Sequence, residues 1–207
     1  VRSGPSGARR RDDRSEISVM SLGAMILSGG ASSRMGAAPG EPGWLGRRAV
    51  DRVADVARAV GATTLVTVGE RDYGLPQVAD DPPQGGPVGG VQAGAAFLRR
   101  AGCARALVLA VDAPTLVGKD LAPLLSASGV GAAYEGLHFP LVFDLTALPP
   151  DAQPDWPMAR FAEMIGVLRL ACPEHARLRL RGANTPDERV ALLSELAPSG
   201  EALCDLL

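Results

Sequence analysis

Residues 26–36 of the chain read Ile26-Leu27-Ser28-Gly29-Gly30-Ala31-Ser32-Ser33-Arg34-Met35-Gly36. An apolar run that is typical of a buried strand ends there at two glycines, and small residues then lead to an arginine. Glycines let backbone N–H groups approach an anion closely, and Arg34 adds a charged fork. The loop therefore favours phosphate binding. A tight turn that needs glycine only for its geometry would explain the same residues.

Outward from this loop, strand and helix patterns alternate. Strands are expected at Leu22–Leu27, Thr63–Val68 and Arg105–Val111, and helices at Arg47–Val60, Gly89–Ala101 and Gly118–Ser126. Continuously apolar strands that alternate with helices predict βαβ units in a parallel sheet. The expected fold class is α/β, a Rossmann-like three-layer sandwich with a mainly parallel sheet.

The rhythm changes after Gly129. Two shorter strands, Val130–Tyr134 and Phe139–Phe143, predict a short antiparallel excursion. The remaining expected elements are a helix at Met158–Ile165, a strand at Val167–Ala171 and a helix at Asp187–Leu196 with Thr185 as its N-cap and Pro186 at its first position. The segment Pro149–Pro157 is expected to be a loop.

The composition of the chain limits the classes of function that it could have. The chain has 207 residues, of which 46% are hydrophobic, so one domain with a real core is expected over residues 21–197. Residues 1–20, with their mixed-charge run, are expected to be a disordered extension, and residues 198–207 a tail. A formal net charge of -2 argues against nucleic-acid binding.

Three cysteines without a CxxC pair suggest neither a disulfide framework nor a zinc site. No apolar run reaches the roughly 18 residues of a membrane span. The N-terminus has no apolar stretch typical of a secretory signal. These observations indicate a cytoplasmic protein that does not act at a membrane.

Two further loops are expected at the carboxyl ends of strands, where ligands bind in open α/β sheets. In one, Asp80 precedes the glycines Gly85, Gly86, Gly89 and Gly90 at a helix start; a long turn with a helix cap would look the same. In the other, Asp112 directly follows a buried strand. A carboxylate there needs a partner such as Mg²⁺ that holds substrate phosphates, or it caps the following turn.

The three loops together resemble those of molybdenum cofactor guanylyltransferases, within the MobA-like nucleotidyltransferases. The resemblance covers about Leu22 to Leu196. The motifs that carry it are Ile26–Gly30 followed by Arg34-Met35-Gly36, Asp80 followed by Gly86-Pro87-Val88-Gly89-Gly90, Asp112-Ala113-Pro114, His138-Phe139-Pro140-Leu141 and Asn184-Thr185-Pro186-Asp187-Glu188. The fold that the resemblance implies is the nucleotide-diphospho-sugar transferase type.

The resemblance implies that GMP passes from GTP to molybdopterin and that pyrophosphate leaves. It implies Mg²⁺ on Asp112 and catalytic roles for Arg34 and Asp112. The implied nucleotide-binding residues are Leu27, Ser28, Gly29, Gly30, Arg34, Thr67, Asp80, Gly86 and Asp112. Molybdenum-cofactor delivery proteins or acceptor enzymes are the implied protein partners.

The chain departs from the family at two positions. The family lysine that follows the Arg-Met-Gly motif is missing, because residues 38–41 read Ala-Pro-Gly-Glu. Thr67 stands where an asparagine is usual. Arg47 or Arg48 could replace the lysine, although arginine is not a simple substitute. The alternatives are therefore a related transferase that uses CTP on the same pterin or GTP on phospholactate, or a non-catalytic nucleotide- or pterin-binding homologue.

Overall fold

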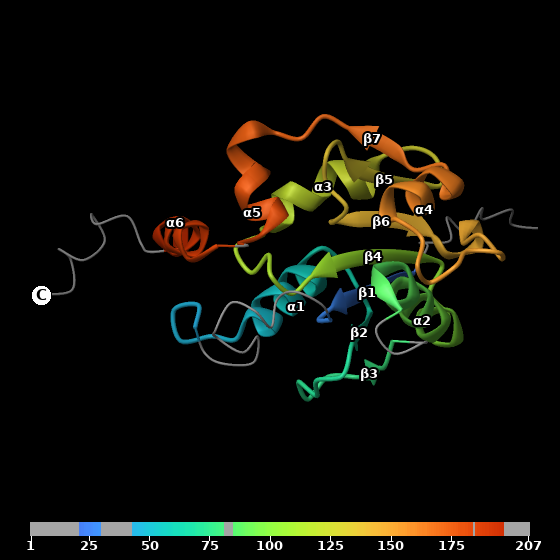
Figure 1. Ribbon diagram of the computed structural model, residues 1–207, viewed down its shortest axis with the longest axis horizontal. Helices are drawn as coiled ribbons and strands as arrows, with labels where there is room; N and C mark the ends of the chain where they lie inside the picture. The colour runs from blue at the N-terminus through green and yellow to red at the C-terminus, as the bar shows by residue number, and fades with distance from the viewer. Residues whose placement is uncertain (1–20, 30–42, 81–84, 184, 197–207) are drawn as a thin grey trace, which may run out of the picture.

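The computed structural model describes residues 21–29, 43–80, 85–183 and 185–196. Seven strands form one sheet in the order β3-β2-β1-β4-β6-β5-β7 (Figure 1). The strands are β1 (Leu22–Leu27), β2 (Thr64–Val68), β3 (Gln77–Val78), β4 (Arg105–Ala110), β5 (Gly131–Tyr134), β6 (Leu141–Asp144) and β7 (Leu168–Leu170). Within the described residues, β6 alone runs antiparallel to its neighbours β4 and β5, so the sheet is mainly parallel, as predicted.

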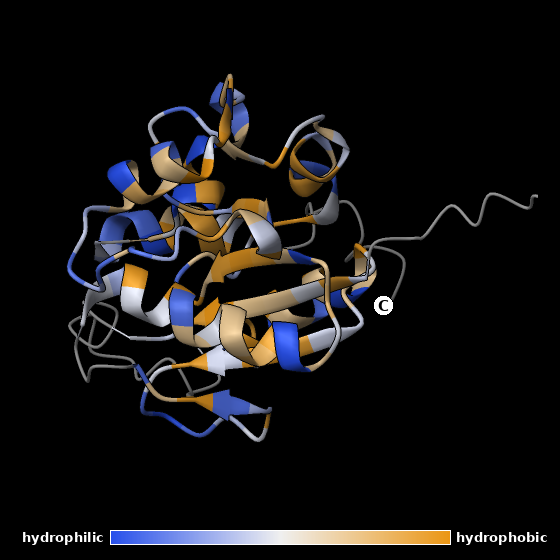
Figure 2. Cartoon of the chain, turned by 90° about the vertical axis from the view of Figure 1, so that its right-hand side faces the viewer, coloured by the Kyte–Doolittle hydropathy of each residue, from blue (hydrophilic) through white to orange (hydrophobic). Residues whose placement is uncertain are grey.

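Helices cover both faces of this sheet and make three layers. They are α1 (Ala49–Ala59), α2 (Gly86–Arg100), α3 (Gly118–Ser126), α4 (Met158–Ile165), α5 (Arg177–Arg181) and α6 (Pro186–Leu196). One apolar core joins α1, α3, α5 and α6 to the sheet, and a second joins α2 and α4 to its other face. Figure 2 shows the apolar residues gathered on the strands between the helices.

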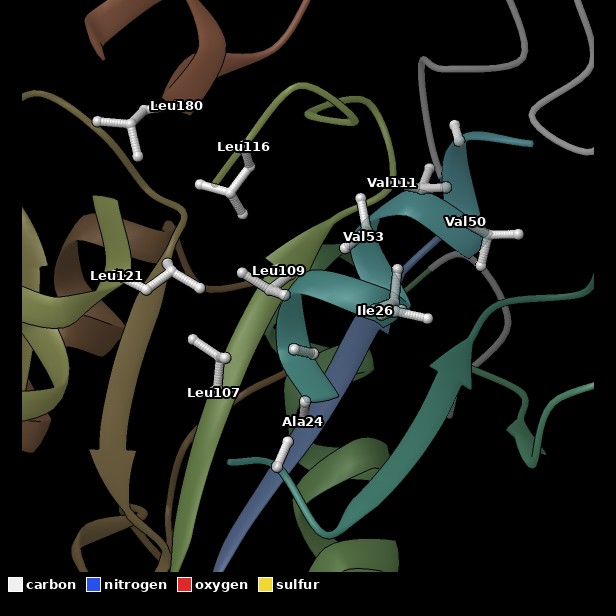
Figure 3. Close-up of a cluster of buried hydrophobic side chains, with 14 of the residues drawn as sticks. Ala24, Ile26, Val50, Val53, Leu107, Leu109, Val111, Leu116, Leu121 and Leu180 are labelled. Carbon is white, nitrogen blue, oxygen red and sulfur yellow. The ribbon is translucent and has the colours of Figure 1, made fainter. Parts of the chain in front are cut away.

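The alternation of side chains along β1 creates the two cores. Ala24 and Ile26 face α1 and contribute to the first core, whereas Met25 belongs to the second; all three are fully buried. Figure 3 shows Ile26 beside Val50 and Val53 of α1. Because β1 is hydrogen-bonded to β2 on one side and to β4 on the other, it lies inside the sheet and needs apolar residues on both faces.

The antiparallel excursion is confirmed, and β6 inserts between β4 and β5 rather than at an edge. Its register places Arg105 opposite Asp144, and the two side chains form an ion pair with 3.0 Å between Nε and Oδ1. Thr185 caps α6 as predicted: its hydroxyl accepts the Glu188 N–H at 3.2 Å, and the Glu188 carboxylate accepts the Thr185 N–H at 3.1 Å.

Several elements differ from the prediction in their bounds; β6, for example, begins at Leu141 rather than Phe139, and α1 at Ala49 rather than Arg47. α2 begins at Gly86, three residues before the predicted start, because Pro87 fits a first helical turn. Neither α5 nor the two-residue strand β3 was predicted. The expected extension over residues 1–20 and the tail over 198–207 lie outside the described residues. No described helix has the length and the apolar character that a membrane span requires.

Candidate functional site

Three parallel strands end together at one edge of the sheet. Leu27 is the last residue of β1, and it pairs with Val68 at the end of β2 and with Ala110 at the end of β4. Beyond the strands, the Ser28 N–H donates to the carbonyl of Val68 at 2.8 Å, and the Val111 N–H donates to the carbonyl of Leu27 at 3.1 Å. The loops that follow β1 and β4 are therefore brought to one place, as the sequence predicts.

The start of the first loop is fixed by Ser28 and Gly69. The Ser28 hydroxyl donates to the carbonyl of Val68 at 2.9 Å. Gly69 has a φ of +133°, and a Cβ there would lie 2.7 Å from the Ser28 hydroxyl oxygen. Any larger residue at position 69 would displace Ser28. The loop continues through Gly29, which is exposed, while Gly30 and Arg34 lie outside the described residues.

Asp80 is enclosed by two glycines from different elements. A Cβ added at Gly29 would lie 3.2 Å from one carboxylate oxygen of Asp80, and a Cβ at Gly90 would lie 3.1 Å from the other. Asp80 is half-buried. Burial raises the pKa of its carboxyl group, and the negative charge of Glu70 raises it further. The predicted first and second loops therefore meet at this carboxylate.

A pair of glycines lets α2 pack closely on the sheet. A Cβ at Gly90 would meet Val68 at 3.3 Å and Leu27 at 3.6 Å, and one at Gly94 would lie 2.7 Å from the Met25 sulfur. Side chains at these positions would push the helix outward. The glycines of this segment thus let the first turns of α2 pack against the ends of β1 and β2. The interpretation of the segment as a plain turn does not include this role.

Gly86 begins α2, and the proline-rich segment packs beside it. Gly86 has a φ of +86°, and a Cβ there would lie 3.3 Å from the carbonyl oxygen of Pro154. Two turns further along α2, the Gln92 side chain donates to the carbonyl of Ala152 at 2.7 Å. The segment that was expected to be a loop therefore follows α2 up to the edge where the strands end.

Asp112 follows β4 and has a carboxylate oxygen without a protein partner. Within the described residues, its Oδ1 is buried and accepts no hydrogen bond. Burial raises the pKa of its carboxyl group, and its own backbone amide partly offsets the rise. α3 begins six residues later at Gly118, and there the Asp120 carboxylate accepts the Val117 N–H at 3.2 Å. Asp112 therefore takes no part in the N-terminus of α3, and a role in the turn that directly follows it stays an alternative.

The carboxylate of Asp112 fits a magnesium ion in its chemistry. The described part of the chain contains no group of three or more histidine, cysteine or acidic side chains that could hold a metal by themselves. Mg²⁺ does not need such a group, because it is usually bound by one or two carboxylates together with substrate phosphates and water. A half-buried carboxylate whose Oδ1 has no protein partner among the described residues, at the edge of an α/β sheet, meets that requirement.

The structure places the other predicted residues as follows. Thr67 is fully buried within β2, and its hydroxyl donates to the carbonyl of Pro76 at 3.2 Å. Arg47 pairs with Asp55 at 2.5 Å, and Arg48 pairs with Asp51 through two hydrogen bonds of 2.6 and 2.7 Å. Both arginines therefore have carboxylate partners on α1, in exposed or partly exposed pairs of the kind that contribute little to stability.

The sequence interpretation missed Tyr73. Its side chain is 3% exposed, and its hydroxyl has no hydrogen-bond partner among the described residues. Burial raises the pKa of this hydroxyl, while Arg71, Ser28 and Arg48 lower it, so the tyrosine lies near the first loop. A single tyrosine in a loop gives no pattern from which this position could be predicted.

Comparisons with known proteins point to one family. The profile of the family described as "MobA-like NTP transferase domain" matches residues 24–153. A molybdenum cofactor guanylyltransferase from Cereibacter sphaeroides is 34% identical over 122 residues, which cover 55% of this chain and 61% of that protein. One from Xanthomonas euvesicatoria pv. vesicatoria (strain 85-10) is 29% identical over 182 residues, which cover 83% of this chain and 94% of that protein.

Solved structures share the fold. A nucleotidyl transferase from Methanothermobacter thermautotroptrophicus superposes with a TM-score of 0.66 at 14% identity and covers 84% of this chain and 97% of its own. A molybdopterin-guanine dinucleotide biosynthesis protein A from Archaeoglobus fulgidus reaches a TM-score of 0.56 at 16% identity, over 84% of this chain and 98% of its own. At such low identity these likenesses establish the architecture.

Proposed function

Because the chain belongs to the MobA-like NTP transferase family, we propose that it transfers GMP from GTP to molybdopterin and releases pyrophosphate. The observation that carries this proposal is the placement of Asp80 and Asp112 at one edge of the sheet, around the loop that starts at Ser28. One carboxylate is suited to a nucleobase and the other to a cation that accompanies a triphosphate.

Asp80 is the residue that reads the base. Guanine presents two adjacent donors, N1–H and the N2 amino group, and a carboxylate can accept both. Cytosine and adenine each present an amino group but no adjacent ring N–H. A side chain at position 29 or 90 would crowd this carboxylate, because its Cβ would come within 3.2 or 3.1 Å of a carboxylate oxygen.

The reaction forms a bond between a phosphate oxygen of the pterin and the α-phosphorus of GTP, and it breaks the bond from that phosphorus to the bridging oxygen of the β-phosphate. The electron pair of the broken bond leaves with pyrophosphate. Mg²⁺ held by Asp112 would neutralise negative charge on the triphosphate. The loop that begins at Ser28, together with Arg34, orients the phosphates and stabilises the departing pyrophosphate.

The missing lysine favours a second candidate, a homologue that binds nucleotide without turnover. Phosphate charge that lacks an ammonium partner costs binding and rate. A titration of GTP, CTP and ATP with Mg²⁺ separates the candidates when it is followed by an assay of pyrophosphate release with molybdopterin. GTP binding with release supports the transferase, and GTP binding without release supports the binding protein. Preference for CTP, or no nucleotide binding, contradicts the proposal.

A further inference from the structure

The turn between α5 and α6 packs against the backbone of Asp112. The Ala183 N–H donates to the carbonyl of Asp112 at 3.2 Å. Gly182 has a φ of +80°, and a Cβ there would lie 2.3 Å from that carbonyl oxygen and 2.7 Å from its carbon. Glycine alone permits so close an approach in this conformation. The backbone of Asp112 is therefore held by a segment that lies about 70 residues away along the chain.

A buried ion pair fixes the position of this turn. Arg179 of α5 donates two hydrogen bonds to the carboxylate of Asp120 of α3, each 2.7 Å long, and the side chains are 11% and 4% exposed. The Tyr134 hydroxyl donates to the Asp120 carbonyl at 2.6 Å. Figure 1 shows α5 beside α3. Because Arg179 precedes Gly182 by three residues, the ion pair sets where the chain enters the turn.

The carboxylate of Asp120 also holds the C-terminal end of the loop that begins at Asp112. The Val117 N–H donates to Oδ2 of Asp120 at 3.2 Å, and Val117 ends the loop that begins at Asp112. Between these ends, the Arg52 guanidinium donates to the carbonyl of Pro114 at 3.0 Å. The loop is thus fixed at its start, middle and end, and two of these three contacts depend on the Arg179–Asp120 pair.

This arrangement explains how the carboxylate of Asp112 can be oriented. An oxygen that must stay open for a cation cannot be oriented by a protein hydrogen bond to that oxygen, and Oδ1 of Asp112 has none among the described residues. The direction of the side chain must then be set by its backbone. We infer that Arg179 and Gly182 are positioning residues that hold Asp112 for the cation. This inference depends on the proposed function, because it assigns the cation to Asp112.

The test compares two glycine substitutions at nearly the same φ; the ψ of 173° at Gly182 adds a backbone constraint of its own, so the double variant described below serves as the independent check. Gly182→Ala introduces a Cβ at a φ of +80° against Asp112, whereas Gly102→Ala introduces one at a φ of +81° with no atom within 4 Å. The affinity for Mn²⁺ is measured by electron paramagnetic resonance with α,β-methylene GTP bound. We expect Gly182→Ala to weaken Mn²⁺ about 10- to 100-fold, as is typical when groups that support metal ligands are lost. Gly102→Ala should leave the affinity unchanged.

Hydrogen exchange of the Ala183 amide in the ligand-free protein gives a second readout that needs no catalysis. We expect exchange at least tenfold faster in Gly182→Ala than in Gly102→Ala. Equal Mn²⁺ affinities in these two variants would overturn the inference. A wild-type protein that binds α,β-methylene GTP without any effect of Mn²⁺ would instead contradict the assignment of the cation in the proposed function.

A second substitution keeps the test decisive if Gly182→Ala does not fold. The double variant Asp120→Asn/Arg179→Gln removes both charges together and leaves no unpaired buried charge. The inference predicts weaker Mn²⁺ binding and faster Ala183 exchange in this variant. Arg179→Lys keeps the charge but loses the two-pronged fork, so it should fall between the double variant and the wild type. Wild-type Mn²⁺ affinity in the folded double variant would contradict the inference.

Discussion

The carboxylate of Asp80 lies directly beside Gly90 of α2, where an added Cβ would come to 3.1 Å from Oδ1. This contact explains why a motif from a helix and an aspartate from a preceding loop belong together. Gly90 has no side chain, and the carboxylate of Asp80 occupies the space that a side chain there would fill. The base-binding role proposed for Asp80 depends on this proximity.

Asp80→Asn should weaken GTP binding roughly 10- to 100-fold, because a hydrogen bond to a charged group contributes about 1.5–3 kcal/mol. An amide oxygen accepts, but the adjacent amide nitrogen only donates and would face a guanine donor. CTP, which has no pair of adjacent donors, should bind the variant about as weakly as it binds the wild type. Isothermal titration with both nucleotides measures the difference. An equal loss for GTP and CTP would argue against base recognition.

Asp112→Asn should lower transfer roughly 10²- to 10³-fold, since it removes a charge that stabilises the reacting groups. It should also raise stability by about 1 kcal/mol, because a half-buried carboxylate with an unpaired buried oxygen is costly. For a chain of this size the gain corresponds to a rise in Tm of about 2–4 °C. Asp151→Asn, at an exposed carboxylate, is the matched control and should change neither quantity.

The pKa of Asp112 gives a pH dependence with a definite sign. The folded protein raises this pKa above its value in the unfolded chain, so the folded state binds the proton more tightly. The cost of the carboxylate is fully present above the folded pKa and disappears below the unfolded value of about 3.9. The stability of the wild type relative to Asp112→Asn should therefore improve as the pH falls through this window. Thermal unfolding of both proteins across pH measures it.

Nucleotide binding should depend on pH in the opposite direction. The pKa of Asp80 is also raised, chiefly by burial, and a protonated carboxyl group cannot accept two hydrogen bonds from guanine. GTP affinity should therefore fall with decreasing pH and begin to fall above the range of an ordinary aspartate. Asp80→Asn should bind GTP with little pH dependence over the same range. A wild-type profile that is flat down to pH 4 would contradict the assignment.

The missing lysine leads to a gain-of-function experiment. Gly40→Lys should tighten GTP binding about tenfold if the triphosphate lies where the family resemblance places it, since charge-assisted contacts to phosphate are strong. Arg34→Ala should weaken GTP more than GMP. Both residues lie outside the described part of the chain. If Gly40→Lys has no effect and the wild type binds GTP no better than GMP, the triphosphate assignment is wrong.

The central part of the fold could be predicted because its pattern is local. The strands β1, β2 and β4 are short apolar runs, and α1 has a clear apolar stripe. In contrast, α5 reads Arg-Leu-Arg-Leu-Arg, an alternation that resembles a strand more than a helix. Its five residues become helical because Leu180 is buried in the core beside α3 and because Arg179 pairs with Asp120. Tertiary contacts overrode the local pattern.

The candidate site was predictable only in its outline. Glycines and acids at strand ends indicated where Asp80 and Asp112 would lie, because the ends of parallel strands meet. The contact of Gly182 with Asp112 and the pair of Asp120 with Arg179 join residues that are distant in sequence. No periodicity or motif in a single sequence connects such residues. They follow from the path of the chain, which the local pattern does not determine.

The glycines of α2 have a consequence for the order in which the protein folds. Within fifteen residues the helix contains four glycines and a proline, and each interior glycine costs about 1 kcal/mol of helix propensity relative to alanine. Such a segment forms little helix by itself. It becomes helical when β1 and β2 present the surface against which Gly90 and Gly94 pack. We therefore expect α2 to be weakly formed in the folding transition state, with low φ-values, whereas α1, which contains no glycine, forms earlier. The side of the proposed nucleotide site that α2 forms would then fold after the sheet that supports it.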